Sequence, residues 1–452
     1  MHRRRFLQAG AAALATPLLP ACEGEARPAA IACDGGILPN PECSGIDHIV
    51  VAMMENRSFD HMLGWVPGAD GIQNGATYRD VNGDAIPAYR LSPDYQGCGL
   101  DDPPHGYEDG RACVNGGAMD GFLHAAAVGD IFPVGYYTAE DLPFYAACAE
   151  HFTICDRYHT GILSSTQPNR MYMHCGQTDR ITTGSTIRFS ELPTVWDAAD
   201  AAGVSSRYYF SNLPYTALWG AKHLRRSRNI SAFEQDAAAG TLASISYVDP
   251  FFYQGGRDDV CNDDHPFADV RNGQRFLKRI YDALRASPQW DRTLLVINYD
   301  EWGGFFDHVV PPFMPVSDEE RDVVGNDGQL GIRVPCVLIG PRVKRGHVES
   351  TLFEPNSILK FMEWRWGLAP LGVRSAVTNN LALALDFDSA PRVDAPEIEV
   401  PPNDPETRIC EDEVAPAMMA AKPESAMSDS MAAHAREVLA LQALARSHGF
   451  TW

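Results

Sequence analysis

The chain has 452 residues, of which 45% are hydrophobic, so it is long enough to bury one large core. Its formal net charge of −22 excludes a broad basic surface of the kind that neutralises nucleic-acid phosphates. The same charge argues against simple electrostatic adsorption to anionic lipid. We therefore expect no nucleic-acid partner.

The first residues are typical of an export signal. Three arginines at residues 3–5 precede an apolar run at residues 11–19, which resembles a twin-arginine signal and is too short to span a membrane. Residues 19–22, Leu-Pro-Ala-Cys, then resemble a lipobox with Cys22 as the lipidated residue, although the proline leaves cleavage without lipidation open. We expect the twin-arginine export machinery to deliver the protein to the periplasm or cell surface, anchored at Cys22 or otherwise secreted.

An apolar run at residues 48–54 predicts a buried strand. It ends at Glu55 and Asn56, and ligands of open α/β sheets bind at the carboxyl ends of strands. The two side chains could instead cap a helix that starts near Ser58. We expect them to form half of a metal site.

Thr166 is the candidate nucleophile. It precedes Pro168, which suits the first turn of a helix, so Thr166 would lie at or just before a helix N-terminus. Free N–H groups and the helix dipole favour an anion there. A hydroxyl at an anion site beside a metal is a nucleophile for phosphate esters, and a simple N-cap is the alternative role.

Two further groups of side chains offer contacts to a substrate. Asn169 and Arg170 could hydrogen-bond a phosphate, although Arg170 could also pair with a structural carboxylate. An aromatic cluster could cage a quaternary ammonium head group, although a buried core is the commoner fate of such a cluster. Its members are Tyr208, Tyr209, Phe210, Tyr215 and Trp219.

The second pair of candidate metal ligands follows another apolar run, at residues 293–299. That run ends at Asp300 and Glu301. Oxygen ligands favour a hard ion such as Mg²⁺, Ca²⁺ or Mn²⁺. The sequence therefore predicts one divalent metal ion, whose ligands are Glu55, Asn56, Asp300 and Glu301.

Apolar runs alternate with helical patterns, as an α/β sheet requires. The remaining predicted strands are residues 206–210 and 333–339, and Asp269 is a plausible N-cap of a helix that continues through Ala286. A Gly-, Pro- and Asp-rich segment, residues 68–118, is predicted to be a loop over the active face.

The predicted domain organisation has four parts. Residues 1–22 are the signal, residues 23–45 a linker and residues 46–390 the catalytic domain. Residues 391–452 are a Pro- and acid-rich tail followed by a helix at residues 424–447, with Val438 and Leu441 among its inward residues.

Besides Cys22 there are ten cysteines, an even number that indicates disulfides in an exported chain. The pairs Cys33–Cys43 and Cys98–Cys113 are close in sequence and lie in Gly- and Pro-rich segments, so we predict these two disulfides. Two others, Cys175 and Cys336, lie in apolar surroundings and are predicted to be free thiols.

Several motifs together resemble the bacterial phosphoesterase family. The motifs run in order from about Asp47 to about Leu385. They are Glu-Asn-Arg-Ser-Phe-Asp-His at residues 55–61, Met-Asp-Gly-Phe at 119–122, Thr-x-Pro-Asn-Arg at 166–170, His-Pro at 265–266 with Asp269, the run from Tyr299 to Val309, and Gly-His-Val at 346–348.

The resemblance implies an alkaline-phosphatase-like α/β fold, a three-layer sandwich with a mostly parallel central sheet flanked by helices. The family holds phosphatidylcholine-cleaving phospholipases C and an acid phosphatase. The resemblance also implies that His105, His265 and His308 line the active site, where one of them could protonate the leaving alkoxide.

The resulting hypothesis is a metal-dependent phosphoric ester hydrolase with a threonine nucleophile. Its first expected substrate is a phospholipid, cleaved to diacylglycerol and a phospho-head group. The second hypothesis is an acid phosphatase that acts on phosphomonoesters, and the third is a non-catalytic surface lipoprotein.

Overall fold

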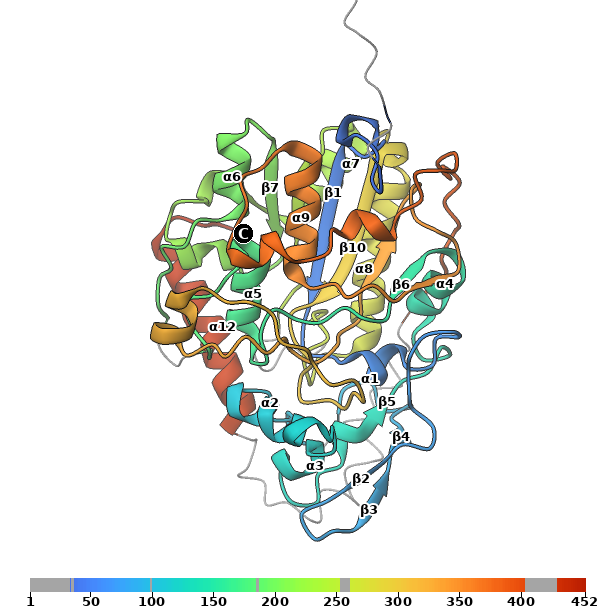
Figure 1. Ribbon diagram of the computed structural model, residues 1–452, viewed down its shortest axis with the longest axis vertical. Coiled ribbons are helices and arrows are strands. Elements are labelled where there is room, and N and C mark those ends of the chain that lie inside the picture. The colour runs from blue at the N-terminus through green and yellow to red at the C-terminus, as the bar shows by residue number, and fades with distance from the viewer. Residues whose placement is uncertain (1–32, 34–35, 98–99, 184–186, 253–260, 403–428) are drawn as a thin grey trace, which may run out of the picture.

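An eight-stranded sheet forms the centre of the computed structural model (Figure 1). The structure describes residues 33, 36–97, 100–183, 187–252, 261–402 and 429–452. In spatial order the strands are β12 (His347–Glu349), β6 (Thr153–Cys155), β11 (Val337–Ile339), β10 (Thr293–Tyr299), β1 (His48–Met54), β9 (Ile245–Val248), β7 (Ser206–Phe210) and β8 (Ser227–Asn229).

The sheet is mostly parallel. The five neighbours from β10 to β8 all run parallel to one another, and β11 is antiparallel to the strands on both of its sides. All residues of β10, and all of β1 except His48, are buried. A continuous apolar run is what a parallel strand covered on both faces requires, so these two strands are also the ones that the sequence pattern marks most clearly.

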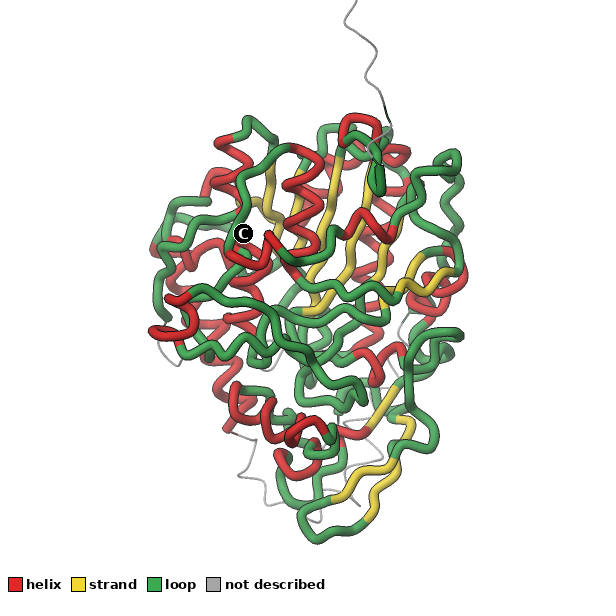
Figure 2. Tube along the Cα trace, viewed as in Figure 1, coloured by secondary structure: helices red, strands yellow, loops and turns green. Residues whose placement is uncertain are grey.

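Helices cover the faces of the sheet (Figures 1 and 2). One contacting group consists of α4 (Pro143–His151), α7 (Ile230–Ala239) and α8 (Val270–Arg285). A second contacting group consists of α5 (Thr166–Cys175), α6 (Val195–Ala201) and α9 (Pro355–Trp366). The layered α/β fold that was expected from the sequence is therefore confirmed.

A smaller lobe lies below the sheet in Figure 1, next to the end of β1 from which α1 continues. Its elements are α1 (Phe59–Leu63), β2 (Thr77–Arg79), β3 (Ala85–Pro87), β4 (Tyr89–Arg90), α2 (Tyr107–Val114), α3 (Phe122–Ala125) and β5 (Gly135–Tyr136). The prediction of a plain loop over residues 68–118 is therefore wrong in part, because the segment also holds three short strands and α2.

Other predicted elements differ less. Strands 206–210 and 293–299 are found with the predicted bounds, and Asp269 caps α8 by accepting a hydrogen bond from the Arg271 N–H. The strand predicted at residues 333–339 begins only at Val337. Arg333 itself forms an isolated bridge with His159, and its carbonyl accepts a hydrogen bond from the Phe59 N–H, so its backbone pairs outside the named strands of the sheet.

One of the two predicted disulfides is present. Cys33 and Cys43 are bonded, beside the short 3₁₀ helix at Pro41–Cys43. Cys113 is a buried free thiol, so its predicted pairing with Cys98, which lies outside the described residues, is wrong. Cys175 and Cys336 are buried free thiols, as expected.

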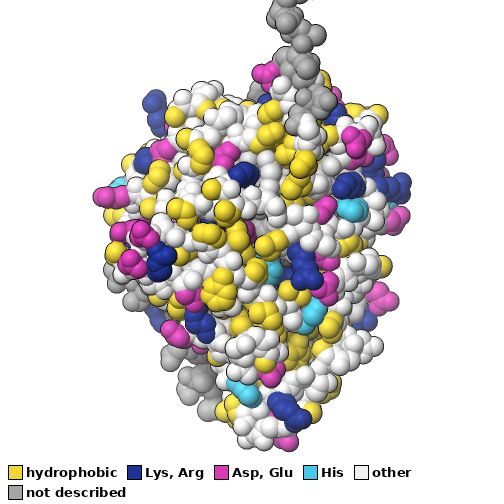
Figure 3. Space-filling model, viewed as in Figure 1, with side chains coloured by type: hydrophobic (Ala, Val, Ile, Leu, Met, Phe, Trp, Pro, Cys, Tyr) yellow, Lys and Arg dark blue, Asp and Glu magenta, His cyan; other side chains and the backbone are white. Residues whose placement is uncertain are grey.

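The last helix is α12 (Asp429–Ser447), and Val438 and Leu441 on it are buried, as predicted. The predicted start at residue 424 lies outside the described residues. In the described part of the chain, no helix has the length and apolar character needed to cross a membrane. On the face shown in Figure 3, acidic and basic side chains are interspersed with hydrophobic ones.

Candidate active site

The register of the two central strands brings the two pairs of candidate metal ligands together. Met54 of β1 lies beside Tyr299 of β10, so Glu55 and Asp300 follow side by side at the same edge. The Asn56 backbone N–H donates to Asp300 Oδ1 at 3.3 Å. Glu301 joins them through its backbone oxygen, which accepts from the Arg57 N–H at 3.1 Å. All four candidate ligands are buried.

Four oxygen atoms of this group lack a hydrogen bond within the described part of the chain. They are both carboxylate oxygens of Glu55, Oδ1 of Asn56 and Oε1 of Glu301. A buried acceptor without a partner costs roughly 1–3 kcal/mol, more when it is charged. A divalent cation bound by oxygen ligands would satisfy these atoms, so the residues present fit such an ion.

The local charge points the same way. Burial raises the pKa of Glu55 well above its ordinary value, and Asp300 raises it further while Arg170 opposes the shift. Burial raises the pKa of Glu301 to about 8, against the opposing effect of His105. The charged forms of these two carboxyl groups are therefore disfavoured at this edge of the sheet, and an added cation would favour them.

Arg170 already has carboxylate partners. Its guanidinium lies 3.1 Å from Asp300, 3.4 Å from Asp249 and 3.5 Å from Glu55. It also lies over the Tyr215 ring, 4.5 Å from its centroid. The pairing of Arg170 with structural carboxylates, the alternative to phosphate binding in the sequence analysis, is the arrangement that the structure shows.

Asn169 faces the backbone of the preceding loop. Its Oδ1 accepts from the Ile162 N–H at 3.0 Å, and its Nδ2 donates to the carbonyls of Ser164 and Ser165 at 2.7 and 3.1 Å. The side chain predicted to bind phosphate therefore holds in place the loop that leads to Thr166.

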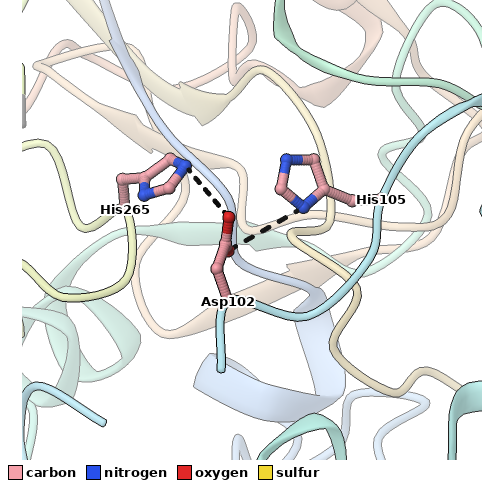
Figure 4. Close-up of side chains that lie close together, drawn as sticks. All are labelled: Asp102, His105 and His265. Carbon is pink, nitrogen blue, oxygen red and sulfur yellow. Dashed lines mark ion pairs between the residues drawn. The ribbon is translucent and has the colours of Figure 1, made fainter. Parts of the chain in front are cut away.

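Two of the three predicted histidines meet around one carboxylate that the sequence analysis missed. Asp102 points between His105 and His265, 3.9 Å from the first and 4.0 Å from the second (Figure 4). His105 Nε2 also lies 3.3 Å from the Asn56 amide nitrogen and 3.6 Å from Glu301 Oε1. His105 thus links the candidate metal ligands to the cavity described below.

The pKa values of these two histidines are shifted in opposite directions. Burial lowers the pKa of His105, but Glu301 and Asp102 outweigh burial and raise it to about 9. Burial lowers the pKa of His265 well below its ordinary value, and His434 and His105 lower it further. The site therefore contains one histidine that favours the proton and one that stays neutral.

His308 belongs to a different cluster. Its Nδ1 lies 2.6 Å from Asp60 and its Nε2 lies 3.0 Å from Asp70. The buried guanidinium of Arg333 pairs with Asp60 and Asp307 in the same group. The structure therefore does not bring His308 close to His105 and His265. The network around His308 is an ion-pair cluster that connects the small lobe to the sheet.

Thr166 is the first residue of α5, and Ser165 is the N-cap. Thr166 is 4% exposed and lines a cavity of about 700 Å³, within the usual range for small-molecule sites. Arg170 follows one turn later, so Thr166 and Arg170 lie on the same face of α5. His105 and Asp102 line the same cavity.

Several residues of the site carry no sequence signal that would have revealed them. Among the described residues, three groups of side chains could hold a metal ion, and the ligand atoms within each group lie within 4.8 Å of one another. One of these groups consists of Glu55, Asp263 and His434. His434 and Glu437 come from α12 and line the cavity with Thr166. In the sequence, His434 and Glu437 are single polar residues in a helical pattern, and such residues commonly lie on the solvent-exposed face of a helix.

The aromatic cluster does not form a cage. Its members are between 0% and 6% exposed, and none of them lines the cavity. Tyr208 hydrogen-bonds Asp249, and Tyr215 lies under Arg170. These side chains are core residues, which was the alternative.

Known proteins similar to this chain match it over most of their length. The profile of the Phosphoesterase family matches residues 46–369. The chain is 30% identical to phospholipase C A of Mycobacterium tuberculosis, over 89% of this chain and 88% of that protein. It is also 30% identical to non-specific phospholipase C6 of Arabidopsis thaliana, over 78% of this chain and 74% of that protein.

Solved structures with a similar arrangement are distant in sequence. A protein of the alkaline phosphatase superfamily from Vibrio parahaemolyticus is 9% identical, with a TM-score of 0.34 over 72% of this chain and 67% of that one. The lipoteichoic acid synthase LtaP from Listeria monocytogenes is also 9% identical, with a TM-score of 0.38 over 76% and 77%.

A hydrolase of phosphoric esters is the class that the family match defines. The chain belongs to the Phosphoesterase family, as its motifs indicated.

Proposed function

We propose that this protein is a metal-dependent phospholipase C that cleaves a phospholipid into diacylglycerol and a phospho-head group, with Thr166 as the nucleophile. The observation that carries the proposal is the set of four buried oxygens without hydrogen bonds, on Glu55, Asn56 and Glu301, next to the cavity that Thr166 lines. The names of the similar phospholipases support the choice of substrate class.

Glu55, Asn56, Asp300 and Glu301 would hold the metal ion. A divalent cation bound there would supply positive charge beside the phosphate and lower the pKa of a nearby hydroxyl. Mg²⁺, Ca²⁺ and Mn²⁺ suit this oxygen-rich set.

The chain's own residues supply the remaining chemistry. The Thr166 hydroxyl releases its proton to solvent, and its oxygen attacks phosphorus, so that a bond from this oxygen to phosphorus forms while the bond to the diacylglycerol oxygen breaks. The N-terminal N–H groups of α5 favour the anionic phosphate. His105 donates a proton to the departing alkoxide and then takes one from a water molecule. The water oxygen bonds to phosphorus while the bond from phosphorus to the Thr166 oxygen breaks, which frees the phospho-head group, and Thr166 regains a proton from solvent.

The first experiment compares two chromogenic esters. We expect faster turnover of p-nitrophenyl phosphorylcholine, a diester, than of p-nitrophenyl phosphate, a monoester. Faster turnover of the monoester would favour an acid phosphatase, and turnover of neither would favour a non-catalytic lipoprotein.

Metal dependence needs a separate measurement. Chelation followed by dialysis should abolish turnover, and adding back one of the three ions should restore it. A Glu301→Gln variant, which keeps the shape but loses the charge, should bind the restoring ion more weakly. Full turnover by protein in which no metal is detected would contradict this part of the proposal.

We also propose that the protein is exported by the twin-arginine machinery and anchored through lipid on Cys22, which lies outside the described residues. The support is the arginine run followed by the lipobox-like Leu19-Pro20-Ala21-Cys22. Mass spectrometry of the mature N-terminus in a bacterial host decides this. An unmodified N-terminal residue would reject the anchor and leave export intact.

A further inference from the structure

The C-terminal helix α12 reaches the same cavity as Thr166. His434, Arg436 and Glu437 of α12 line that cavity together with Thr166, His105 and Asp102. The Phosphoesterase family match ends at residue 369, so this helix lies outside the residues that the family profile matches. The helix therefore contributes side chains that the family motifs do not assign.

The helix is docked on the body of the protein. Val438 and Leu441 are 1% and 0% exposed, and the Gln442 side chain donates to the Asn212 carbonyl at 3.1 Å. Further along, Ala445 packs against Ala217 of the 3₁₀ helix η4 (Tyr215–Trp219). Buried apolar side chains and a buried hydrogen bond fix the direction in which the helix approaches the cavity.

Three contacts join α12 to the residues on either side of the reaction centre. The His434 ring stacks on the His265 ring, with the centroids 3.8 Å apart and the planes 20° from parallel. His434 Nε2 lies 4.0 Å from Glu55 Oε2. On the other side, the Gln167 side chain, next to Thr166, donates to Glu437 Oε1 at 2.7 Å.

We propose that α12 is part of the catalytic site and that His434 is a positioning residue, which acts by holding the His265 ring. This inference rests on the proposed phosphoesterase function. The stacked His434 ring covers one face of His265, while Asp102 and the Pro266 carbonyl face the nitrogens of His265. The imidazole plane is thereby fixed between α12 and the small lobe.

Fixing that plane matters because Asp102 lies between His265 and His105, the proton donor of the proposed mechanism, and catalytic geometry tolerates little error. A displacement of about 1 Å in a reacting group can lower a rate by about 100-fold. His434 acts through its flat ring. A phenylalanine side chain should therefore be able to replace it, and a small or non-planar side chain should not be able to.

The test compares three substitutions with a matched control in the full-length protein. We expect His434→Ala to lower kcat for p-nitrophenyl phosphorylcholine by about tenfold to 100-fold, with little change in KM. His434→Phe should restore most of kcat, and His434→Leu should not. Leu439→Ala, at a residue of the same helix that is 50% exposed, should behave as the parent protein does.

Two outcomes overturn the positioning role. One is a His434→Ala protein with the kcat of the parent. The other is equal activity of the Phe and Leu variants, which would show that bulk and not a flat ring is needed. Should the Ala variant fail to fold, the comparison of Phe with Leu still decides between these readings.

A second readout does not depend on turnover. Diethylpyrocarbonate modifies accessible neutral imidazoles, and the rate at His265 can be followed by peptide mass spectrometry. His265 should react slowly in the parent and in His434→Phe, and faster in His434→Ala and His434→Leu. Equal rates in all four proteins would show that α12 does not cover His265.

The two readouts separate the inference from the proposed function. A parent protein that turns over neither ester contradicts the function, and the positioning role falls with it. The modification rates would then still decide whether α12 packs on His265. An active parent with unaffected His434 variants contradicts the inference alone.

Discussion

Arg170 shows most clearly how single residues balance charge at this site. One buried guanidinium faces Glu55, Asp249 and Asp300, so carboxylates outnumber cations around it. Burial lowers the pKa of Arg170, but Asp249 and Asp300 raise it, so the side chain stays charged. The residue is therefore part of the support under the metal ligands.

Replacing Arg170 should destabilise the protein even without substrate. Arg170→Met leaves three buried carboxylates without their shared counter-charge, and losing one partner of a buried ion pair costs roughly 3–5 kcal/mol. We expect a loss of that size in the free energy of unfolding, measured with urea. Arg188→Met is the control, because Arg188 is 65% exposed and such surface pairs contribute about 0–1 kcal/mol. An Arg170→Met protein as stable as its parent would show that the guanidinium is reserved for substrate.

His174 should make stability depend on pH. Burial lowers its pKa from 6.5 to about 3, and Arg170 lowers it further, while the Trp196 indole N–H donates to its Nδ1 at 3.1 Å. The unfolded chain therefore binds the proton first as the pH falls below 6.5. The stability contribution of neutral His174 is present above that pH and is lost as the pH falls towards 3.

The size of this effect follows from one proton. Between pH 6 and pH 4, His174→Gln should reduce the slope of the unfolding free energy by about 1.36 kcal/mol per pH unit. Urea unfolding at a series of pH values measures the slope. His124→Gln, at an exposed histidine, should leave the slope unchanged. An identical slope in the parent and in His174→Gln would contradict the buried neutral state.

At the scale of elements, the ends of β1 and β10 touch through a glycine. Gly303 has φ +63°, and a Cβ there would lie 2.1 Å from the Asn56 carbonyl oxygen. The Gly303 N–H donates to Glu301 Oε2 at 2.7 Å. The turn after β10 thus lies directly against the end of β1, and only glycine fits at position 303.

Gly303→Ala should therefore weaken metal binding. The added methyl group must displace the Asn56 backbone, and disturbance of groups that orient ligands weakens metal affinity by about 10- to 100-fold. Isothermal titration of the stripped protein with Mn²⁺ measures the change. Gly367→Ala is the control, because Gly367 has φ +66° but open space around a Cβ, so it adds only left-handed strain. Unchanged affinity in Gly303→Ala would separate this turn from the metal site.

The elements that could be predicted from sequence are those with uninterrupted local patterns. The strand ends at Glu55 and Asp300 were found because buried parallel strands are continuous apolar runs that stop at polar residues. The Cys98–Cys113 pairing failed because nearness in sequence does not supply the geometry a disulfide needs. The role of Asn169 was missed because its partners are backbone groups, which leave no trace in residue types.

At the scale of the whole molecule, the cavity is assembled from three distant parts of the chain. The small lobe supplies Asp102 and His105, α5 supplies Thr166, and α12 supplies His434. The sequence predicted helices at α5 and α12 and a loop at residues 68–118, but it could not place α12 at the cavity, because that contact depends on long-range packing. The candidate metal ligands came from two of the strands that the sheet makes adjacent, which a sequence pattern does reveal.

The central claim is that Thr166 is a nucleophile and not only a residue at the start of a helix. Ser165, not Thr166, is the N-cap of α5, so removing the Thr166 hydroxyl removes no cap and should cost little stability, whereas each 1.36 kcal/mol of barrier changes a rate by about tenfold. The direct measurement is turnover of p-nitrophenyl phosphorylcholine by folded Thr166→Ala and Thr166→Ser proteins with equal metal content. The account predicts that the Ala variant loses nearly all turnover and that the Ser variant, which keeps a hydroxyl, retains part of it. An Ala variant that turns over the ester as fast as the parent would contradict the account and leave an activated water as the attacking group.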